Sequence, residues 1–153
     1  DLYKMPVAEQ IHHYVRPQEN ANKTDVRWVA LTNRQNIGLL AVGDKLLNTS
    51  AWPYLQSDID FIAGKDGEQS ASGLIPVTTK HSIDISQRNL VTFNIDDKQM
   101  GVGGDTSWGR LVHPQYTIEA KTMSYGFTLV PVSNTEIPLA SFARTVFTVA
   151  KQK

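Results

Sequence analysis

Hydrophobic and polar residues alternate along the segment 24–31, which is the pattern of a half-buried β-strand. One face of that strand would be apolar and the other charged, with Val26, Trp28 and Ala30 opposite Asp25 and Arg27. A polar turn over 32–36 leads into a second apolar run at 37–42. The two runs and the turn predict a β-hairpin.

Similar alternation recurs later in the chain. The segments 81–85 and 90–95 predict a second hairpin, and 116–120 and 124–130 predict two more strands. In the last of these, Tyr125, Phe127 and Leu129 would share one face. We also expect a final strand over 143–150.

One short helix is predicted after the first hairpin. Ser57 is its expected N-cap, Asp58 and Asp60 would lie in the first turn, Ile59, Ile62 and Ala63 would face inward, and Gly64 would end it. The stretch 64–73 has no periodicity and is predicted to be a solvated loop.

These elements predict an all-β fold, an antiparallel β-sandwich with one short helix. At 153 residues, we expect one domain over 1–153, with weaker patterns at the ends, 1–13 and 132–153. The length excludes a (β/α)8 barrel, which needs about 250 residues. The chain starts Asp1-Leu2-Tyr3-Lys4, without an initiator Met, and we therefore expect it to be a piece of a longer protein.

Charge and composition exclude several kinds of partner. Lys and Arg total 15, as do Asp and Glu, so we expect neither nucleic acid nor a membrane surface as partner. Without cysteine there are no disulfides or thiolate zinc sites, and the four histidines have no metal-binding spacing. We expect no metal and no cofactor. The compartment, cytoplasm or periplasm, stays open.

The glycine-rich segment 100–109 is the most informative stretch for function. It does not fit a dinucleotide-binding fingerprint, because Thr106 occupies the third glycine position and no helical pattern follows. Gly101, Gly103 and Gly104 are instead expected to shape a loop that presents Asp105, Ser107 and Trp108. An indole beside hydrogen-bonding groups suits a sugar, which has an apolar face and a ring of hydroxyls. Equally, Trp108 could close the end of the sandwich.

A second polar group surrounds the start of the first strand. Glu19, Asp25 and Arg27 are interpreted as a structural ion-pair network that closes the preceding turn. Contact with a ligand is the alternative role for these residues.

Three motifs in order carry a resemblance to a known family. They are Tyr14-x-Arg16-Pro17-Gln18-Glu19-Asn20, then Thr24-Asp25-Val26-Arg27-Trp28, then the run from Asn94 to Gly109 that contains Gly103-Gly104-Asp105-x-Ser107-Trp108, with His113-Pro114 after it. Together they resemble the C-terminal small-chain domain (domain 5) of large bacterial β-galactosidases of glycoside hydrolase family 2. The resemblance covers about Tyr14 to Pro131.

The resemblance implies the C-terminal half of a galactose-mutarotase-like supersandwich. It implies a parent enzyme that hydrolyses terminal β-galactosides such as lactose by a retaining mechanism, with catalytic glutamates in a separate barrel domain. Trp108 would stack on the aglycone sugar, and Asp105 and Ser107 would lie beside it. The isolated chain is expected to be inactive and the parent to be a homo-oligomer. No position matches the catalytic residues of a mutarotase, so epimerase activity is not implied.

Two other interpretations compete with a galactosidase fragment. The chain could be an independent carbohydrate-binding module that uses the same loop, or a structural β-sandwich that acts only in protein association. An exposed apolar patch, suited to packing against other domains, would favour the fragment.

Overall fold

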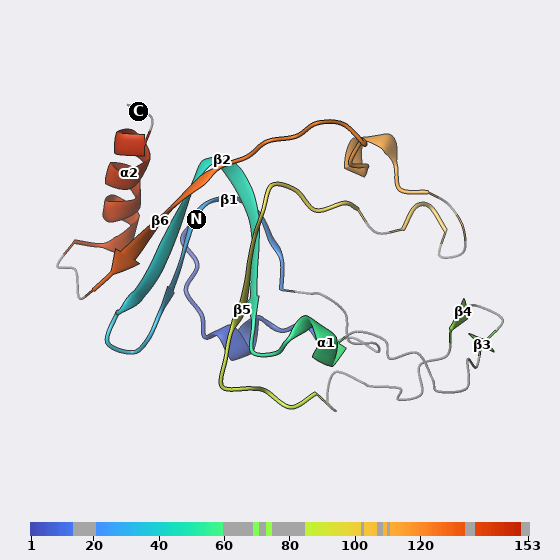
Figure 1. The fold of residues 1–153 in the computed structure, drawn as a ribbon, viewed down its shortest axis with the longest axis horizontal. Helices are drawn as coiled ribbons and strands as arrows, with labels where there is room; N and C mark the ends of the chain where they lie inside the picture. Colours follow the sequence, from blue (N-terminus) through green and yellow to red (C-terminus); the bar gives the residue numbers. More distant parts are fainter. Residues whose placement is uncertain are drawn as a thin grey trace. The chain divides into compact units, whose positions relative to one another are not determined.

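The computed structural model describes residues 1–13, 21–59, 69–70, 73–74, 85–101, 103–106, 109, 111–133 and 137–150 (Figure 1). Its elements in chain order are η1 (Val7–Gln10), β1 (Lys23–Thr32), β2 (Gly38–Trp52), α1 (Gln56–Ile59), β3 (Gln69–Ser70), β4 (Gly73–Leu74), β5 (Thr92–Asp96), η3 (Pro114–Tyr116), β6 (Phe127–Val132) and α2 (Leu139–Ala150). Across this described part, the helices are too short or too polar to span a membrane. The predicted all-β, antiparallel and sandwich-like fold class is confirmed.

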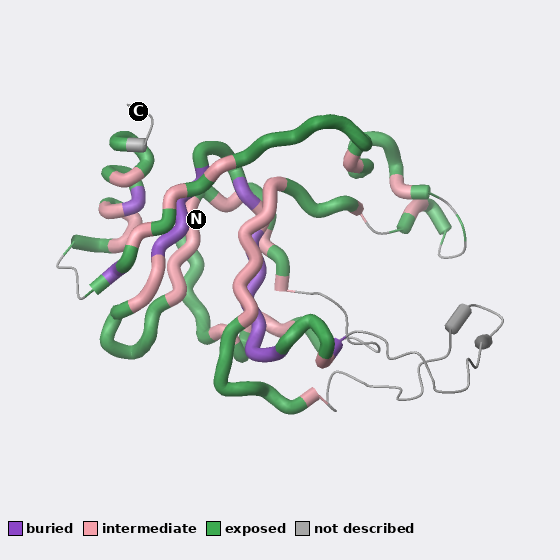
Figure 2. The backbone as a smooth tube through the Cα atoms, viewed as in Figure 1, coloured by how far each residue is buried: buried purple, intermediate pink, exposed green. Residues whose placement is uncertain are grey.

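β2 is the centre of the main sheet. The strand order is β1-β2-β5, and β6 also pairs with β2. β1 and β6 both run antiparallel to β2 and flank its first residues, Gly38–Val42. Figure 2 shows buried positions along much of β2, as expected for a central strand.

The predicted hairpin of β1 and β2 is confirmed, and Asn33 explains its turn. The Asn33 backbone amide donates to the Ile37 carbonyl oxygen at 2.9 Å, and the Asn33 carbonyl accepts from the Asn36 amide at 3.0 Å. The Asn33 side-chain oxygen also accepts from the amides of Gln35 and Ile37. Asn36 has a φ of 57°, a conformation that asparagine tolerates well.

The pairing of β1 with β2 contains a bulge. Val26 pairs with Leu47, whereas Trp28 pairs with Val42, so the residues 43–46 of β2 have no counterpart in β1. We call residues 43–46 the β2 bulge. Asp44, Lys45 and Leu46 are exposed there, because bulged residues leave the plane of the ladder.

The chain divides into two compact units with separate cores. The unit that comprises Lys23–Thr49 and Ile95–Lys153 has its core between the sheet and α2. The fully packed core residues there are Leu40, Val42, Val132 and Ala143, with Trp28, Ala30, Leu139, Phe142 and Val146 around them. The apolar face predicted for β1 is therefore confirmed at Trp28 and Ala30.

The strand predicted over 143–150 is wrong, because this segment belongs to α2 (Figure 1). Leu139, Ala143 and Val146 follow the spacing of one helical face, and that face packs on the sheet. The chain thus has a second helix, longer than the one predicted near Ser57. The last turns, 146–150, are almost continuously apolar, and such a short run fits a strand as well as a helix.

β6 alternates as predicted, with its apolar outer face exposed. Val132 is buried in the core, whereas Phe127 and Leu129 are 37% and 48% exposed. The rings of Tyr125 and Phe127 lie 6.1 Å apart between centroids. The predicted shared face of Tyr125, Phe127 and Leu129 therefore points away from α2 and its core.

The second unit comprises Asp1–Asn22 and Ser50–Asn94. Its core is formed by Trp52, Tyr54 and Ile59, with Ile11, Ala21 and Ile85 packed against them. Ile59 lies in α1 and is buried, as the helix prediction required. Ser57 lies within α1 instead of before it, so its predicted N-cap role is wrong, and Asp60 to Gly64 lie outside the described residues.

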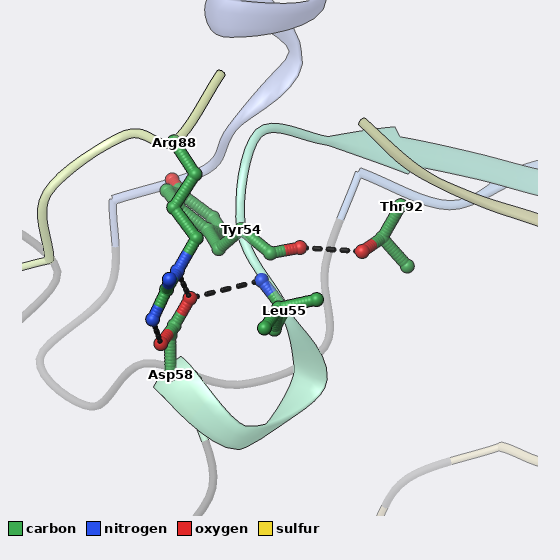
Figure 3. A network of polar contacts seen from close by, with 5 residues as sticks. All are labelled: Tyr54, Leu55, Asp58, Arg88 and Thr92. Carbon is green, nitrogen blue, oxygen red and sulfur yellow. Dashed lines mark hydrogen bonds and ion pairs between the residues drawn. The ribbon is translucent and has the colours of Figure 1, made fainter. Parts of the chain in front are cut away.

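An ion pair fixes α1 to a distant segment of this unit (Figure 3). Arg88 donates to both carboxylate oxygens of Asp58, at 2.6 and 2.7 Å, and Asp58 also accepts from the backbone amide of Leu55 at 2.9 Å. The hydrogen bond to Asp58 and its charge raise the pKa of Arg88. Nearby, the Thr92 hydroxyl donates to the Tyr54 carbonyl.

Three further predictions need correction or lie partly outside the described residues. The segment 116–120 is not a strand, because Pro114 starts the 3-10 turn η3 and an extended, exposed stretch follows. Residues 81–84 are not described, and the described partner of β5 is β2. Within the loop predicted at 64–73, β3 pairs with β4 over two residues, too few for a periodic pattern.

Candidate functional site

The residues predicted to bind sugar lie in the segment 97–126, which connects β5 to β6. We call it the β5–β6 segment. Asp105, Gly101, Gly103 and Gly104 are described, whereas Ser107 and Trp108 lie outside the described residues. The site can therefore be built from the residues that hold the glycine-rich loop on either side.

Gly101 is held closely against the return of the same segment. Its amide donates to the carbonyl oxygen of Tyr116 at 2.9 Å. A Cβ atom at position 101 would lie 2.8 Å from both the Tyr116 Cβ and the Val112 Cγ1, closer than carbon atoms approach. Only glycine fits here without displacement of these neighbours.

Gly103 is needed for a different reason. It has a φ of 74°, in the left-handed region, and a Cβ there would meet no atom within 4 Å. A larger residue would thus be strained by backbone conformation and not by contact. Gly104, next to it, is half-buried.

Asp105 and His113 join the glycine-rich loop to the return of the segment. The Asp105 Oδ1 lies 2.6 Å from the His113 Nε2, and both side chains are largely exposed. An ionised carboxylate only accepts hydrogen bonds, so the proton must be on Nε2. The contact orients the imidazole, and within the described residues no hydrogen bond uses the second carboxylate oxygen or Nδ1.

A short 3-10 turn supports His113. The Tyr116 amide donates to the His113 carbonyl at 2.9 Å, and the Thr117 hydroxyl contacts the carbonyls of Val112 and His113 at 3.3 and 3.2 Å. These bonds satisfy backbone groups around η3 locally. The residue that holds Asp105 is thereby fixed by its own backbone.

Sequence reasoning did not select His113 as a site residue. The sequence marks His113 only as part of a motif with Pro114, because a single histidine has no characteristic spacing. Its role depends on contact with Asp105, eight residues earlier, across a loop whose path the sequence does not specify.

The network predicted around β1 stays a prediction, because Glu19 lies outside the described residues. Asp25 and Arg27 are both exposed on β1, and Asp25 has a φ of 56° at an irregularity in the pairing with β2. Among the residues that the structure describes, no ion pair joins Asp25 to Arg27. In that same part of the chain, no group of three or more histidines and carboxylates could hold a metal ion.

A family model described as "Beta galactosidase small chain" matches residues 1–129. This chain belongs to the β-galactosidase small-chain family. The match includes the glycine-rich loop, Asp105, His113 and η3. It confirms the family resemblance inferred from the motifs.

Known β-galactosidases are similar to this small-chain segment. A β-galactosidase of Priestia megaterium is 36% identical over 132 residues, which cover 86% of this chain and 11% of that protein. A β-galactosidase of Halalkalibacterium halodurans is 31% identical over 77% of the chain and 10% of its own length. A β-galactosidase of Lactobacillus delbrueckii subsp. bulgaricus is 29% identical over 78% of this chain and 10% of its own length. The segment thus spans about a tenth of these relatives.

Proposed function

We propose that this chain is the C-terminal small-chain segment of a retaining β-galactosidase that hydrolyses terminal β-galactosides such as lactose. Its role is to supply the aglycone side of the active site through the glycine-rich loop. Trp108 provides the aromatic platform, and Asp105 and Ser107 provide hydrogen-bonding groups beside it. The catalytic glutamates belong to a barrel domain outside this chain, so the chain by itself is inactive.

The observation that carries the proposal is the contact between Asp105 and His113. It holds a carboxylate on the surface, 70% exposed, with one oxygen used by the imidazole and the other facing no described partner. Such an oxygen readily accepts hydrogen bonds from pyranose hydroxyls. A fixed polar group close in sequence to an indole is the combination that a sugar needs.

Binding the aglycone helps catalysis without any group of this chain touching the reacting bond. Interactions with a remote part of the substrate orient the scissile bond toward the catalytic carboxylates. The loop would therefore affect lactose, which has a glucose aglycone, more than substrates with no aglycone sugar. It would also affect transfer to a glucose acceptor.

We infer that the outer face of β6 packs against other domains of the same enzyme. Phe127 and Leu129 present exposed apolar side chains there, with Tyr125 beside them. A self-sufficient module has little reason to expose such a row. This favours the enzyme fragment over an independent carbohydrate-binding module or a purely structural sandwich.

The test compares lactose with β-galactosyl fluoride, whose leaving group is a single atom. In the galactosidase that contains this chain, we expect Trp108→Ala to lower kcat/KM for lactose about tenfold or more and to leave that for the fluoride within about twofold. Trp108→Phe, which keeps an aromatic face, should retain most of the lactose activity. Unchanged kinetics with lactose and with a glucose acceptor would overturn the proposal.

The isolated chain provides a second test. We expect no shift of its indole N–H resonances on titration with glucose, galactose or lactose, because most of the site belongs to other domains. Saturable shifts that disappear in Trp108→Ala would instead support the independent binding module.

A further inference from the structure

Lys45, in the β2 bulge, joins the two ends of the β5–β6 segment. Its Nζ lies 2.8 Å from the Asp97 Oδ1, where the segment leaves β5, and it donates to the Ser124 carbonyl at 3.0 Å, where the chain enters β6. Asp97 and Ser124 are 27 positions apart in the sequence. A single ammonium group therefore bridges the start and the end of the segment that carries the candidate site.

Three other hydrogen bonds reinforce the same base. The Tyr125 hydroxyl donates to the Ile95 carbonyl at 2.9 Å, and the Asn48 side-chain amide donates to the Asp97 carbonyl at 3.1 Å. The backbone amide of Asp44, beside Lys45, donates to the Gly126 carbonyl at 3.0 Å. The β2 bulge thus lies against both ends of the segment, and Lys45 is the residue that contacts both.

The ion pair of Lys45 is better protected from water than its counterpart within the segment. Asp97 is only 12% exposed and Lys45 is 48% exposed. In the pair of Lys121 and Glu119, both side chains are more than 60% exposed. Ion pairs that are partly removed from water are less screened, and loss of one partner leaves the other charge unsatisfied.

We propose that Lys45 is a positioning residue for the aglycone side of the galactosidase, because it fixes the base from which the glycine-rich loop and His113 extend. This inference rests on the proposed function of that loop. Within the described part of the β5–β6 segment, there is no strand that pairs with the main sheet. Its orientation therefore depends on how its two ends are held.

Figure 1 shows this arrangement along the chain. The backbone leaves β5 and later returns to β6, and both connections run close to β2. The contacts of Gly101 with Tyr116 and of Asp105 with His113 then hold the outgoing and returning parts of the segment together. A rotation at the base would move these contacts as one body, so a small change at Lys45 becomes a larger displacement at the loop.

The test replaces Lys45 in the complete galactosidase. Lys45→Met removes the ammonium group and keeps an unbranched side chain. We expect kcat/KM for lactose to fall about tenfold, mainly through a higher KM, because misplacement of a binding group by about 1 Å is costly. Hydrolysis of β-galactosyl fluoride should stay within about twofold, since it involves no aglycone contact. Lys45→Arg, which keeps the charge, should restore most of the lactose activity.

Lys121→Met is the matched control. It removes the same charge from an ion pair of the β5–β6 segment, but its partner Glu119 is exposed and neither residue contacts Asp97 or Ser124 in a described ion pair or hydrogen bond. We expect both substrates to react as in the unmodified enzyme. Asp97→Asn is a milder change at the same contact and should reproduce part of the lactose defect. It keeps the inference testable if a Lys45 variant fails to fold.

Hydrogen exchange gives a readout that does not depend on activity. In Lys45→Met, peptides that contain the Asp44 amide should exchange faster, whereas peptides from Leu40 to Val42 in the core of the sheet should be unchanged. Equal loss of activity with both substrates, or unchanged lactose kinetics despite faster exchange, would overturn the inference. If Trp108→Ala leaves lactose use unchanged, the proposed function itself fails, independently of Lys45.

Discussion

Gly43 in the β2 bulge lies so close to Lys45 that a side chain at position 43 would begin 2.3 Å from the Lys45 carbonyl oxygen. The same Cβ would lie 2.7 Å from the Cγ of Leu47, which is fully buried. A larger residue at position 43 would therefore force the bulge, and with it Lys45, to shift.

We expect Gly43→Ala to lower the free energy of unfolding by about 1–3 kcal/mol, because backbone and a packed core side chain must both move. Urea unfolding measures the change. Gly109→Ala is the control, since a Cβ at that position meets no atom within 4 Å, and it should change stability by less than about 0.5 kcal/mol. Equal effects of the two substitutions would contradict the close packing of the bulge.

Leu40 and Leu129 lie on opposite faces of the main sheet and should respond differently to truncation. Leu40 is 0% exposed in the core under α2, whereas Leu129 is 48% exposed on the outer face of β6. Leu40→Ala should destabilise the chain by about 2–5 kcal/mol, and Leu129→Ala by less than about 1 kcal/mol. In the complete enzyme, Leu129→Ala should weaken packing between domains, measurable as a lower Tm of the assembly. A large effect of Leu129→Ala in the isolated chain would argue against an exposed outer face.

Burial raises the pKa of the Tyr54 hydroxyl above its ordinary value of 10.0. Below about pH 10 both the folded and the unfolded states keep this proton, so stability is unaffected there. Above about pH 10 the unfolded state loses the proton first, and the free energy of unfolding falls as the pH rises through the folded pKa. Tyr54→Phe should therefore show a shallower loss of stability at alkaline pH.

Unfolding at about pH 8 and about pH 11, with and without the substitution, measures this effect of Tyr54. Tyr3→Phe removes the same hydroxyl from a ring that is 78% exposed and serves as the control. If Tyr54→Phe and the unmodified chain lose stability in parallel, the hydroxyl does not contribute to the alkaline transition.

Asp105 should matter for activity more than for stability. Its pair with His113 is exposed, and exposed pairs contribute about 0–1 kcal/mol, so Asp105→Ala should change the free energy of unfolding by less than about 1 kcal/mol. In the complete enzyme, we expect Asp105→Ala to lower kcat/KM for lactose more than it lowers kcat/KM for β-galactosyl fluoride. Each value is compared with that of the unmodified protein. Asp1→Ala changes the same residue type at an exposed position outside the segment. A loss of stability without any change in substrate preference would count against a role in binding.

The elements that sequence predicts well are those fixed by neighbouring residues. The hairpin of β1 and β2 follows from local turn chemistry at Asn33, and the apolar face of β1 follows from simple alternation. The segment 143–150 was misassigned because its last residues fit two periods, and only packing of Ala143 on Leu40 and Val42 selects the helical one. Tertiary contact decided what local pattern left ambiguous.

The candidate site divides in the same way. The glycine-rich loop can be predicted from the sequence because its positions require glycine. Gly101 has no room for a side chain, and Gly103 has a positive φ. The roles of His113 and Lys45 cannot be predicted from the sequence, because each acts through a partner that only the folded chain brings close. A lysine between Asp44 and Leu46 has no signature that distinguishes it from any solvated lysine, and only its distances to Asp97 and Ser124 do so.

Because Lys45 joins the two ends of the β5–β6 segment, a change in the length of this segment would alter the free energy of folding only slightly. Once the two ends are joined, the entropy of closing a loop grows only with the logarithm of its length, so doubling the segment would cost about 0.6 kcal/mol. Residues added between Lys98 and Met123 would leave the registers of β2 with β1 and β6 unchanged. If the proposed function holds, insertions here would alter which sugars the aglycone side admits, while the sheet that supports the segment keeps its pairing.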